Sequence, residues 1–383
     1  MHGGFRTDDV GVGVRAVPWG RGMRRAVAVL GGVAVSDTFD LVRAPRLSIV
    51  IPTPSDTAAM EETLVSVLEN RPDDCEIVVA LGCDYADPWN IGEEVRFVHA
   101  PAGASLVRCV NLGVAASAGS VVHILAAGWR ATEGWTDLPL ERFEDDEVAA
   151  VVPLGVAADD RDRVVAAGVR YAVGGRRIDV AADPRWRRAG VAGDLPTGSA
   201  LPQGPVLEAG FWRADVLGLA GDGFTTACGD RAADADMAVT LVAGGRRVVV
   251  ERHSQILVPA AGAGPRVPAF EAGLHAERLF WRSVVGTSLP WAILLHVGEV
   301  VRHAVARAPL GTLPMLLGRL VGVLQFGSYV GRGVQLRGLV ASRSRAAAGA
   351  SGEERRTIRI DGPEKAVRRP RRVHEPAPLR KSA

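Results

Sequence analysis

Residues 47 to 51 of this chain have the sequence LSIVI, and Pro52 follows them. A short, mostly apolar run closed by proline is typical of a strand that is buried on both faces of a parallel sheet. Side chains able to cap a helix follow at residues 53 to 56, and the apolar residues behind them recur at helical spacing, at Met60, Leu64, Val67 and Leu68. The stretch therefore predicts a strand, a loop and a helix.

The same alternation continues along the chain. Further buried strands are predicted at residues 76–81, 95–99, 121–125 and 148–153. Between the third and the fourth, a stretch rich in Ala, Leu and Val ends at Gly119. Strands that alternate with helices imply an α/β fold with a doubly wound, mostly parallel sheet, whose ligand site lies at the carboxyl ends of the strands.

The middle of the chain has a different pattern. Residues 169–173 and 176–180 flank Gly174 and Gly175, which predicts a β-hairpin with a two-residue turn. Residues 181–205 show no clear period and are interpreted as a surface excursion over the sheet. Two strands and two helices are then expected, the strands at 205–211 and 246–251 and the helices at 213–219 and 234–243.

The two ends of the chain are predicted to lie outside the sheet domain. Residues 1–45 form an N-terminal extension, in which RRAVAVLGGVAV, from Arg24, is interpreted as a strand rather than a signal peptide, because more than twenty residues precede it and no clean cleavage site follows. The sheet domain is placed at residues 46–258 and a helical region at 259–340. Residues 341–383 have few apolar side chains and are expected to be a disordered basic tail.

The helical region begins with a Pro/Gly linker at residues 259–268, and helices are expected at about 269–285, 290–307 and 312–330. The last two are apolar on most faces, but charged residues, Gly and Pro interrupt them before they reach the length of a membrane span. Two interpretations remain open. Residues 290–340 lie on a membrane surface as peripheral helices, or they pack on the sheet domain or on another subunit.

Charge and cysteine usage limit the classes of partner and the compartment. The formal net charge is +2, but the last 43 residues hold 12 Lys and Arg against 5 Asp and Glu, so the rest of the chain is mildly acidic. This argues against a nucleic-acid partner, which needs clustered positive charge. The four cysteines form no CxxC pair, which favours a reducing, cytoplasmic location.

Four segments, in this order, resemble glycosyltransferase family 2: LSIVIPTPSDTAAMEETLVSVL, EIVVALG, NLGVAASAGSVVHIL, and the stretch from GFWRADVLG to DADMAVTLVAGGRRVVV. The resemblance covers about residues 47 to 258. It implies the Rossmann-like A-type glycosyltransferase fold and transfer of a sugar, with inversion, from a UDP-, GDP- or dTDP-linked donor to a hydroxyl of a glycan or lipid-linked acceptor. A role in polysaccharide or cell-envelope biosynthesis, in the cytoplasm or at the inner face of the cell membrane, would follow.

The resemblance also implies a divalent metal, Mg²⁺ or Mn²⁺, held by a DxD motif after the fourth strand. Here the matching positions are Ala126, Ala127 and Gly128, and Leu81 and Gly82 stand where the family has an aspartate pair after the second strand. No metal ligand is therefore assigned. The missing acids keep an alternative open, a catalytically inactive pseudo-glycosyltransferase that acts as a binding or assembly partner.

Two acidic positions match the catalytic segment of the family. Asp234 and Asp236 correspond to the later two acids of its ExD cluster, in which Ala233 replaces one member. The resemblance makes Asp234 the candidate general base. The alternative is a structural role, because an aspartate at the start of a helix is stabilised by the free backbone N–H groups and the helix dipole.

Weaker correspondences complete the expected site. The donor is assigned to four residues, Thr53, Arg108, Asn111 and His253, and the acceptor to three, Phe211, Trp212 and Arg213. Each has a structural alternative: helix capping, a solvated surface arginine, a core aromatic side chain, or a hydrogen-bonded histidine. A later segment, LHAERLFWRS, resembles a family helix whose basic residues contact the diphosphate.

Overall fold

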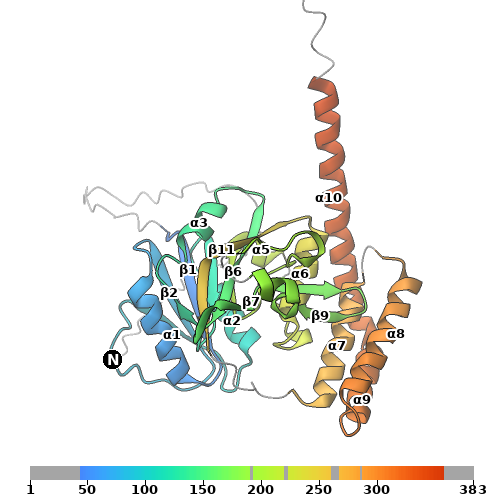
Figure 1. Ribbon diagram of the computed structural model, residues 1–383, viewed down its shortest axis with the longest axis horizontal. Helices are drawn as coiled ribbons and strands as arrows, with labels where there is room; N and C mark the ends of the chain where they lie inside the picture. Colours follow the sequence, from blue (N-terminus) through green and yellow to red (C-terminus); the bar gives the residue numbers. More distant parts are fainter. Residues whose placement is uncertain (1–43, 190–192, 220–222, 260–266, 285–286, 358–383) are drawn as a thin grey trace, which may run out of the picture. The chain divides into compact units, whose positions relative to one another are not determined.

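The computed structural model describes residues 44–189, 193–219, 223–259, 267–284 and 287–357 (Figure 1). The strand expected from Arg24 onward and the last part of the predicted tail, from residue 358, lie outside the described residues. The expected α/β architecture is confirmed within them, because one nine-stranded sheet is surrounded by helices and followed by further helices.

The first half of the sheet is parallel. Strand β1 (Leu47–Thr53) lies between β2 (Cys75–Leu81) and β4 (Val121–Leu125), and β3 (Val95–His99) pairs with β2 on the outside. The resulting order β3-β2-β1-β4 is that of one half of a doubly wound, Rossmann-like sheet. All four strands match their predicted positions closely.

Burial on both faces explains why these strands are continuous apolar runs. In β1, Ile49 and Ile51 pack in one core cluster with the apolar side of α1 (Thr57–Asn70), whereas Val50 packs in a second cluster with α2 (Leu106–Ala116). Side chains alternate between the faces of a strand, so one apolar run serves two helices. Helix α1 begins as predicted, with the Asp56 carboxylate accepting a hydrogen bond of 3.0 Å from the Ala59 N–H.

The second half of the sheet is mixed. Strand β10 (Ala209–Arg213) is antiparallel to both β4 and β6 (Val148–Ala157), and β11 (Arg247–Val258) is parallel to β6. The prediction of a strand from Pro205 to Phe211 is wrong at both ends, because residues 206 to 209 form a tight turn before β10. The sequence did not indicate β5 (Arg130–Ala131), which pairs with β11, or β7 (Asp160–Ala166), which pairs with β6.

The predicted hairpin is present as β8 (Val169–Ala172) and β9 (Arg176–Asp179). Three residues connect the strands instead of two, and Gly175 has a φ of 92°, which favours glycine. The remaining short elements are the helices α3 (Asp137–Arg142), α4 (Pro184–Ala189), α5 (Ala214–Gly218) and α6 (Ala233–Ala243), with 3₁₀ turns at Val180–Ala182, Gly198–Ala200, Thr226–Cys228 and Phe326–Tyr329.

The three expected C-terminal helices are confirmed as α7 (Ala269–Ser283), α8 (Leu289–Ala306) and α9 (Thr312–Leu324). Helices α7 and α9 cross in backbone contact (Figure 1), since a Cβ atom on Gly273 would lie 2.0 Å from the Met315 carbonyl oxygen and one on Gly318 would lie 1.9 Å from that of Phe270. The two glycines therefore set the spacing of these helices.

A fourth helix, α10, runs from Val330 to Thr357. The prediction of disorder from residue 341 is therefore wrong as far as Thr357, because Arg, Ala and Glu favour a helix even where apolar residues are few. Among the described residues, no single helix is long and apolar enough to cross a membrane. The pair Thr312–Leu324 and Phe326–Arg345, bent by 63°, meets that criterion together by length and composition.

A buried histidine fixes the centre of the sheet. His123 on β4 is fully buried, its Nδ1 lies 3.1 Å from the Gly210 carbonyl oxygen, and its ring stacks on Phe211 at 3.8 Å between centroids. The indole N–H of Trp135 donates to its Nε2 at 3.2 Å. The histidine is therefore the neutral tautomer with a proton on Nδ1, and burial lowers its pKa to about 3.

His123 predicts an acid-dependent loss of stability. Between its usual pKa of 6.5 and the folded value of about 3, the unfolded chain binds a proton that the folded protein does not. The free energy of unfolding should therefore decrease as the pH falls from 6.5 toward 3. Urea denaturation across this range should give a shallower pH dependence for His123→Gln than for the unmodified chain; equal slopes would contradict the assignment.

Candidate functional site

A cavity of 410 Å³ lies where the strands end. Val258, the last residue of β11, and Trp129, four residues after β4, form part of its apolar wall. Its charged lining consists of Arg177, Asp179, Glu208 and Arg231. This is the edge at which α/β sheets bind ligands, so the cavity is the candidate functional site.

An ion pair joins the cavity lining to a buried carboxylate, since Arg177 is partly exposed in the cavity and Asp234 is buried behind it. The Nε of Arg177 on β9 lies 2.9 Å from one carboxylate oxygen of Asp234 in the first turn of α6, and its Nη2 lies 2.8 Å from the other. The N–H groups of Leu207 and Ala235 also donate to this carboxylate. Asp234 is 1% exposed, so its carboxylate is enclosed by Arg177 and these two N–H groups.

Two further carboxyl groups line the cavity itself. Burial and the neighbouring charge of Asp234 raise the pKa of Glu208, against the opposite effect of Arg177. Burial likewise raises the pKa of Asp179, whose carboxylate accepts a hydrogen bond from the Ala181 N–H. A carboxyl group with a raised pKa next to a fixed arginine is an arrangement common at sites of proton transfer.

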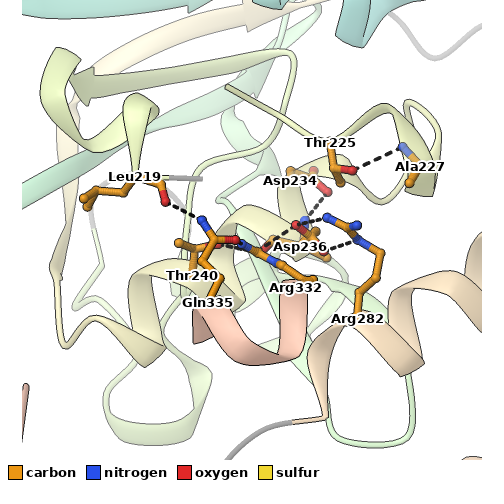
Figure 2. A network of polar contacts seen from close by, with 10 residues as sticks. Leu219, Thr225, Ala227, Asp234, Asp236, Thr240, Arg282, Arg332 and Gln335 are labelled. Atoms are coloured by element: carbon orange, nitrogen blue, oxygen red, sulfur yellow. Dashed lines mark hydrogen bonds and ion pairs between the residues drawn. The ribbon is translucent and has the colours of Figure 1, made fainter. Parts of the chain in front are cut away.

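Asp236, the second predicted catalytic residue, lies in a different environment (Figure 2). Its carboxylate is 2.9 Å from Nε of Arg282 on α7 and 2.8 Å from Nη2 of Arg332 on α10. Arg332 also bonds the Thr240 hydroxyl. Asp236 is 3% exposed and is not among the residues that line the described cavity, so the structure gives it the role of joining α6, α7 and α10.

None of the four residues assigned to the donor lines this cavity. Thr53 is fully buried at the end of β1 and Arg108 is exposed on α2. Asn111 donates to the Phe224 carbonyl oxygen at 2.7 Å and accepts from the Phe224 N–H at 2.8 Å, so it fixes a loop. His253 is exposed at an irregularity of β11.

The residues assigned to the acceptor belong to the core. Phe211 and Trp212 are fully buried on opposite faces of β10, Phe211 against His123 and Trp212 against Phe224, so neither offers a ring to a sugar. Arg213 donates to backbone carbonyl oxygens of residues 143, 145 and 148. The burial of Phe211 and Trp212 matches the structural alternative stated for them, core aromatic side chains.

The described residues do not fit a divalent metal of the expected kind. Ala126, Ala127 and Gly128 stand at the positions of the DxD motif and carry no carboxylate. Ala126 instead donates its backbone N–H to the Glu208 carbonyl oxygen, and Gly128 has a φ of 89°. No group of three or more His, Cys, Asp or Glu in the described ranges is arranged to hold an ion.

Five residues that line the cavity were not predicted from the sequence: Arg177, Asp179, Glu208, Arg231 and Trp129. One signal was available, since Glu208 is the only charged residue in the apolar run from Val206 to Trp212. The others come from the hairpin and from loops, whose approach to the sheet edge depends on tertiary structure.

No known family profile matches the chain. Polypeptide N-acetylgalactosaminyltransferase 12 of Mus musculus is 31% identical over 127 residues, which are 30% of this chain and 22% of the relative, and the Homo sapiens protein matches equally. The chain thus spans only 22% of the length of these curated relatives. The match is to a glycosyltransferase, in agreement with the family resemblance.

Several solved structures are similar to this chain. Mannosyltransferase PcManGT from Pyrobaculum calidifontis, in complex with GDP-Man and Mn²⁺, is 14% identical, with 79% of this chain and 88% of that chain covered and a TM-score of 0.44. S. aureus TarS 1-349 is 9% identical, with 79% and 92% covered and a TM-score of 0.48. GalNAc-T7 with UDP, GalNAc and Mn²⁺ is 15% identical, with 63% and 48% covered and a TM-score of 0.45.

The structural role of Asp236 can be tested by removing its charge. Asp236→Asn leaves Arg282 and Arg332 buried without their counter-charge, so the free energy of unfolding in urea should fall by about 3 to 5 kcal/mol. Asp159→Asn is the control, because Asp159 pairs with Arg163 at the surface, and it should change stability little. A stable Asp236→Asn protein without activity would instead support the catalytic assignment.

Proposed function

We propose that this chain is a glycosyltransferase that transfers a sugar from a nucleoside-diphosphate donor to a hydroxyl acceptor, with inversion. The observation that supports this best is the cavity at the carboxyl ends of the strands, in which a carboxyl group of raised pKa, Glu208, lies next to the fixed guanidinium of Arg177. The family resemblance over residues 47 to 258 and the match to a polypeptide N-acetylgalactosaminyltransferase support the same class of reaction.

Glu208 is the proposed general base. Removing the proton from an acceptor hydroxyl requires a carboxylate whose pKa is raised toward the working pH, because such a group binds the proton more strongly in the transition state. Glu208 meets this condition and lines the cavity, whereas Asp234 does not line it. Asp234 is therefore proposed as a positioning residue that acts through Arg177.

Arg177 and Arg231 are the proposed partners of the donor diphosphate. Both line the cavity, and guanidinium groups bind phosphate oxygens through parallel N–H bonds. As the sugar is transferred, negative charge builds up on the leaving diphosphate, and a fixed positive charge stabilises it. This arrangement assigns to arginines the charge neutralisation that a DxD-bound ion gives in the family, and Arg108, Asn111 and His253 are not part of it.

We also propose a peripheral position at the membrane for this enzyme, with a role in polysaccharide or cell-envelope synthesis. The membrane position is supported by the apolar surface of α8 and α9 within residues 290–340, where large side chains such as Leu294 and Leu324 are 60% and 77% exposed.

Donor binding is the first test. Calorimetric titration with UDP-, GDP- and dTDP-linked sugars should show binding of at least one donor, with the same Kd in Mn²⁺ and in EDTA, because arginines supply the positive charge. Binding only in Mn²⁺ would contradict the proposed arginine site. If no activated sugar binds, the chain is the inactive alternative.

The proposed base gives a second test. Glu208→Gln should lower kcat by about 10²- to 10⁴-fold, with the Kd of the donor unchanged, because only proton removal is lost. The unmodified enzyme should lose kcat/KM toward acid pH with a midpoint above the usual carboxyl range, since Glu208 must be deprotonated. Glu141→Gln, an exposed change on α3, is the matched control. Full activity of Glu208→Gln would exclude it as the base.

A further inference from the structure

A second cavity lies between the hairpin and the C-terminal helices. It has a volume of 190 Å³ and shares Arg177 and Arg231 with the candidate site. Its lining is strongly basic, since six arginines face it against one carboxylate, Glu299. The arginines are Arg176, Arg177, Arg231, Arg302, Arg307 and Arg319.

The carboxylates around this cavity do not balance its arginines. Glu299 serves both Arg176, at 3.2 Å, and Arg302, at 2.6 Å. Arg319 and Arg177 each have one carboxylate, Glu277 and Asp234. Within the described ranges, Arg307 pairs with no carboxylate, and its guanidinium donates to the Val267 carbonyl oxygen at 3.4 Å. Positive charge therefore exceeds negative charge in the wall, which favours an anionic ligand.

Arg319 gives an independent indication of a ligand. Its side chain is 8% exposed, yet its Nε has no hydrogen-bond partner among the described residues. Its two Nη atoms contact Glu277 and His303. Burial and the charges of Arg319, Arg307 and Arg302 lower the pKa of His303 to about 4, as expected where cations accumulate. Because a buried guanidinium N–H normally has an acceptor, the open Nε suits an oxyanion.

Helices α8 and α9, which carry Arg302 and Arg319, also hold most of the exposed large apolar side chains among the described residues. Helices α8 and α9 pack against each other (Figure 1), and their connection includes Leu310, which is 90% exposed. Further large apolar side chains on the two helices are at least half exposed, at Leu294, Val301, Val305, Leu313, Leu320 and Leu324. Apolar helix faces next to arginines are typical of elements that lie at a membrane interface.

We propose that this arginine cavity binds the phosphate group of a membrane lipid, while α8 and α9 insert their apolar side chains into the same bilayer. A volume of 190 Å³ is below the about 300 to 1,000 Å³ of sites for larger organic ligands, and it suits a phosphate head. The part that concerns catalysis rests on the proposed function: through Arg177 and Arg231, a bound phospholipid head lies next to the sugar-transfer cavity, as a lipid-borne acceptor requires.

Vesicle sedimentation with the full chain tests the proposal. Three kinds of vesicle are compared: phosphatidylcholine alone, phosphatidylcholine with phosphatidic acid, and phosphatidylcholine with the same amount of phosphatidylserine. The comparison distinguishes a site specific for phosphate from a general attraction to negative charge. Binding should be strongest with phosphatidic acid, whose phosphate is terminal. The double variant Arg302→Gln and Arg307→Gln should lose this preference, because it removes two cations from the cavity wall.

Two matched variants complete the design. Arg161→Gln with Arg163→Gln removes the same charge from β7, outside the cavity, and should keep the preference for phosphatidic acid. Leu313→Ser with Leu324→Ser should weaken binding to all three kinds of vesicle, because it removes apolar contact rather than charge. Thermal unfolding of each variant establishes that the fold is retained.

The proposal is overturned if the unmodified chain binds no vesicles. It is also overturned if vesicles with phosphatidic acid and with phosphatidylserine bind equally well and the two double arginine variants bind them to the same extent. Binding of soluble pyrophosphate without any vesicle binding would show that the cavity binds free phosphates, and it would overturn the proposal that the ligand is a lipid. None of these measurements uses a sugar donor. Vesicle binding without sugar transfer therefore refutes the proposed sugar transfer and leaves the lipid site. Transfer to a soluble acceptor without vesicle binding refutes the lipid site and the proposed membrane position and leaves the transferase activity.

Discussion

The structure depends on the neutralisation of two buried carboxylates in the first turn of α6. Asp234 takes its counter-charge from Arg177 in the hairpin, and Asp236 takes its own from Arg282 on α7 and Arg332 on α10. A buried charge without a partner costs several kcal/mol, so these arginines determine where the hairpin and the helices meet the sheet domain. One turn of α6 thereby connects three other elements of the chain, the hairpin, α7 and α10.

This connection also separates two chemical environments. On one side of Arg177, the cavity at the strand ends contains Glu208 and Asp179, carboxyl groups with raised pKa. On the other side, the cavity at α8 and α9 is dominated by arginines. Because Arg177 and Arg231 belong to both walls, a change in the charge of one cavity affects the electrostatic potential of the other.

The parallel half of the sheet could be predicted because a strand that is buried on both faces has a continuous apolar sequence, such as LSIVI. The strand after Pro205 was misplaced, since a turn at residues 206 to 209 has the same apolar composition as a strand. The site was harder. Asp234 was located from the resemblance, but its partner Arg177 is 57 residues away, and only the folded chain shows that this carboxylate is already occupied.

The close crossing of α7 and α9 has a consequence for the charge of the molecule. Gly318 precedes Arg319, and this crossing holds that guanidinium 2.9 Å from Glu277 on α7. Helix spacing and the strength of this ion pair are therefore mechanically coupled. A force that pushes α9 outward, such as lateral pressure from surrounding molecules, would separate Arg319 from Glu277. The guanidinium of Arg319 would then be free to bind another anion.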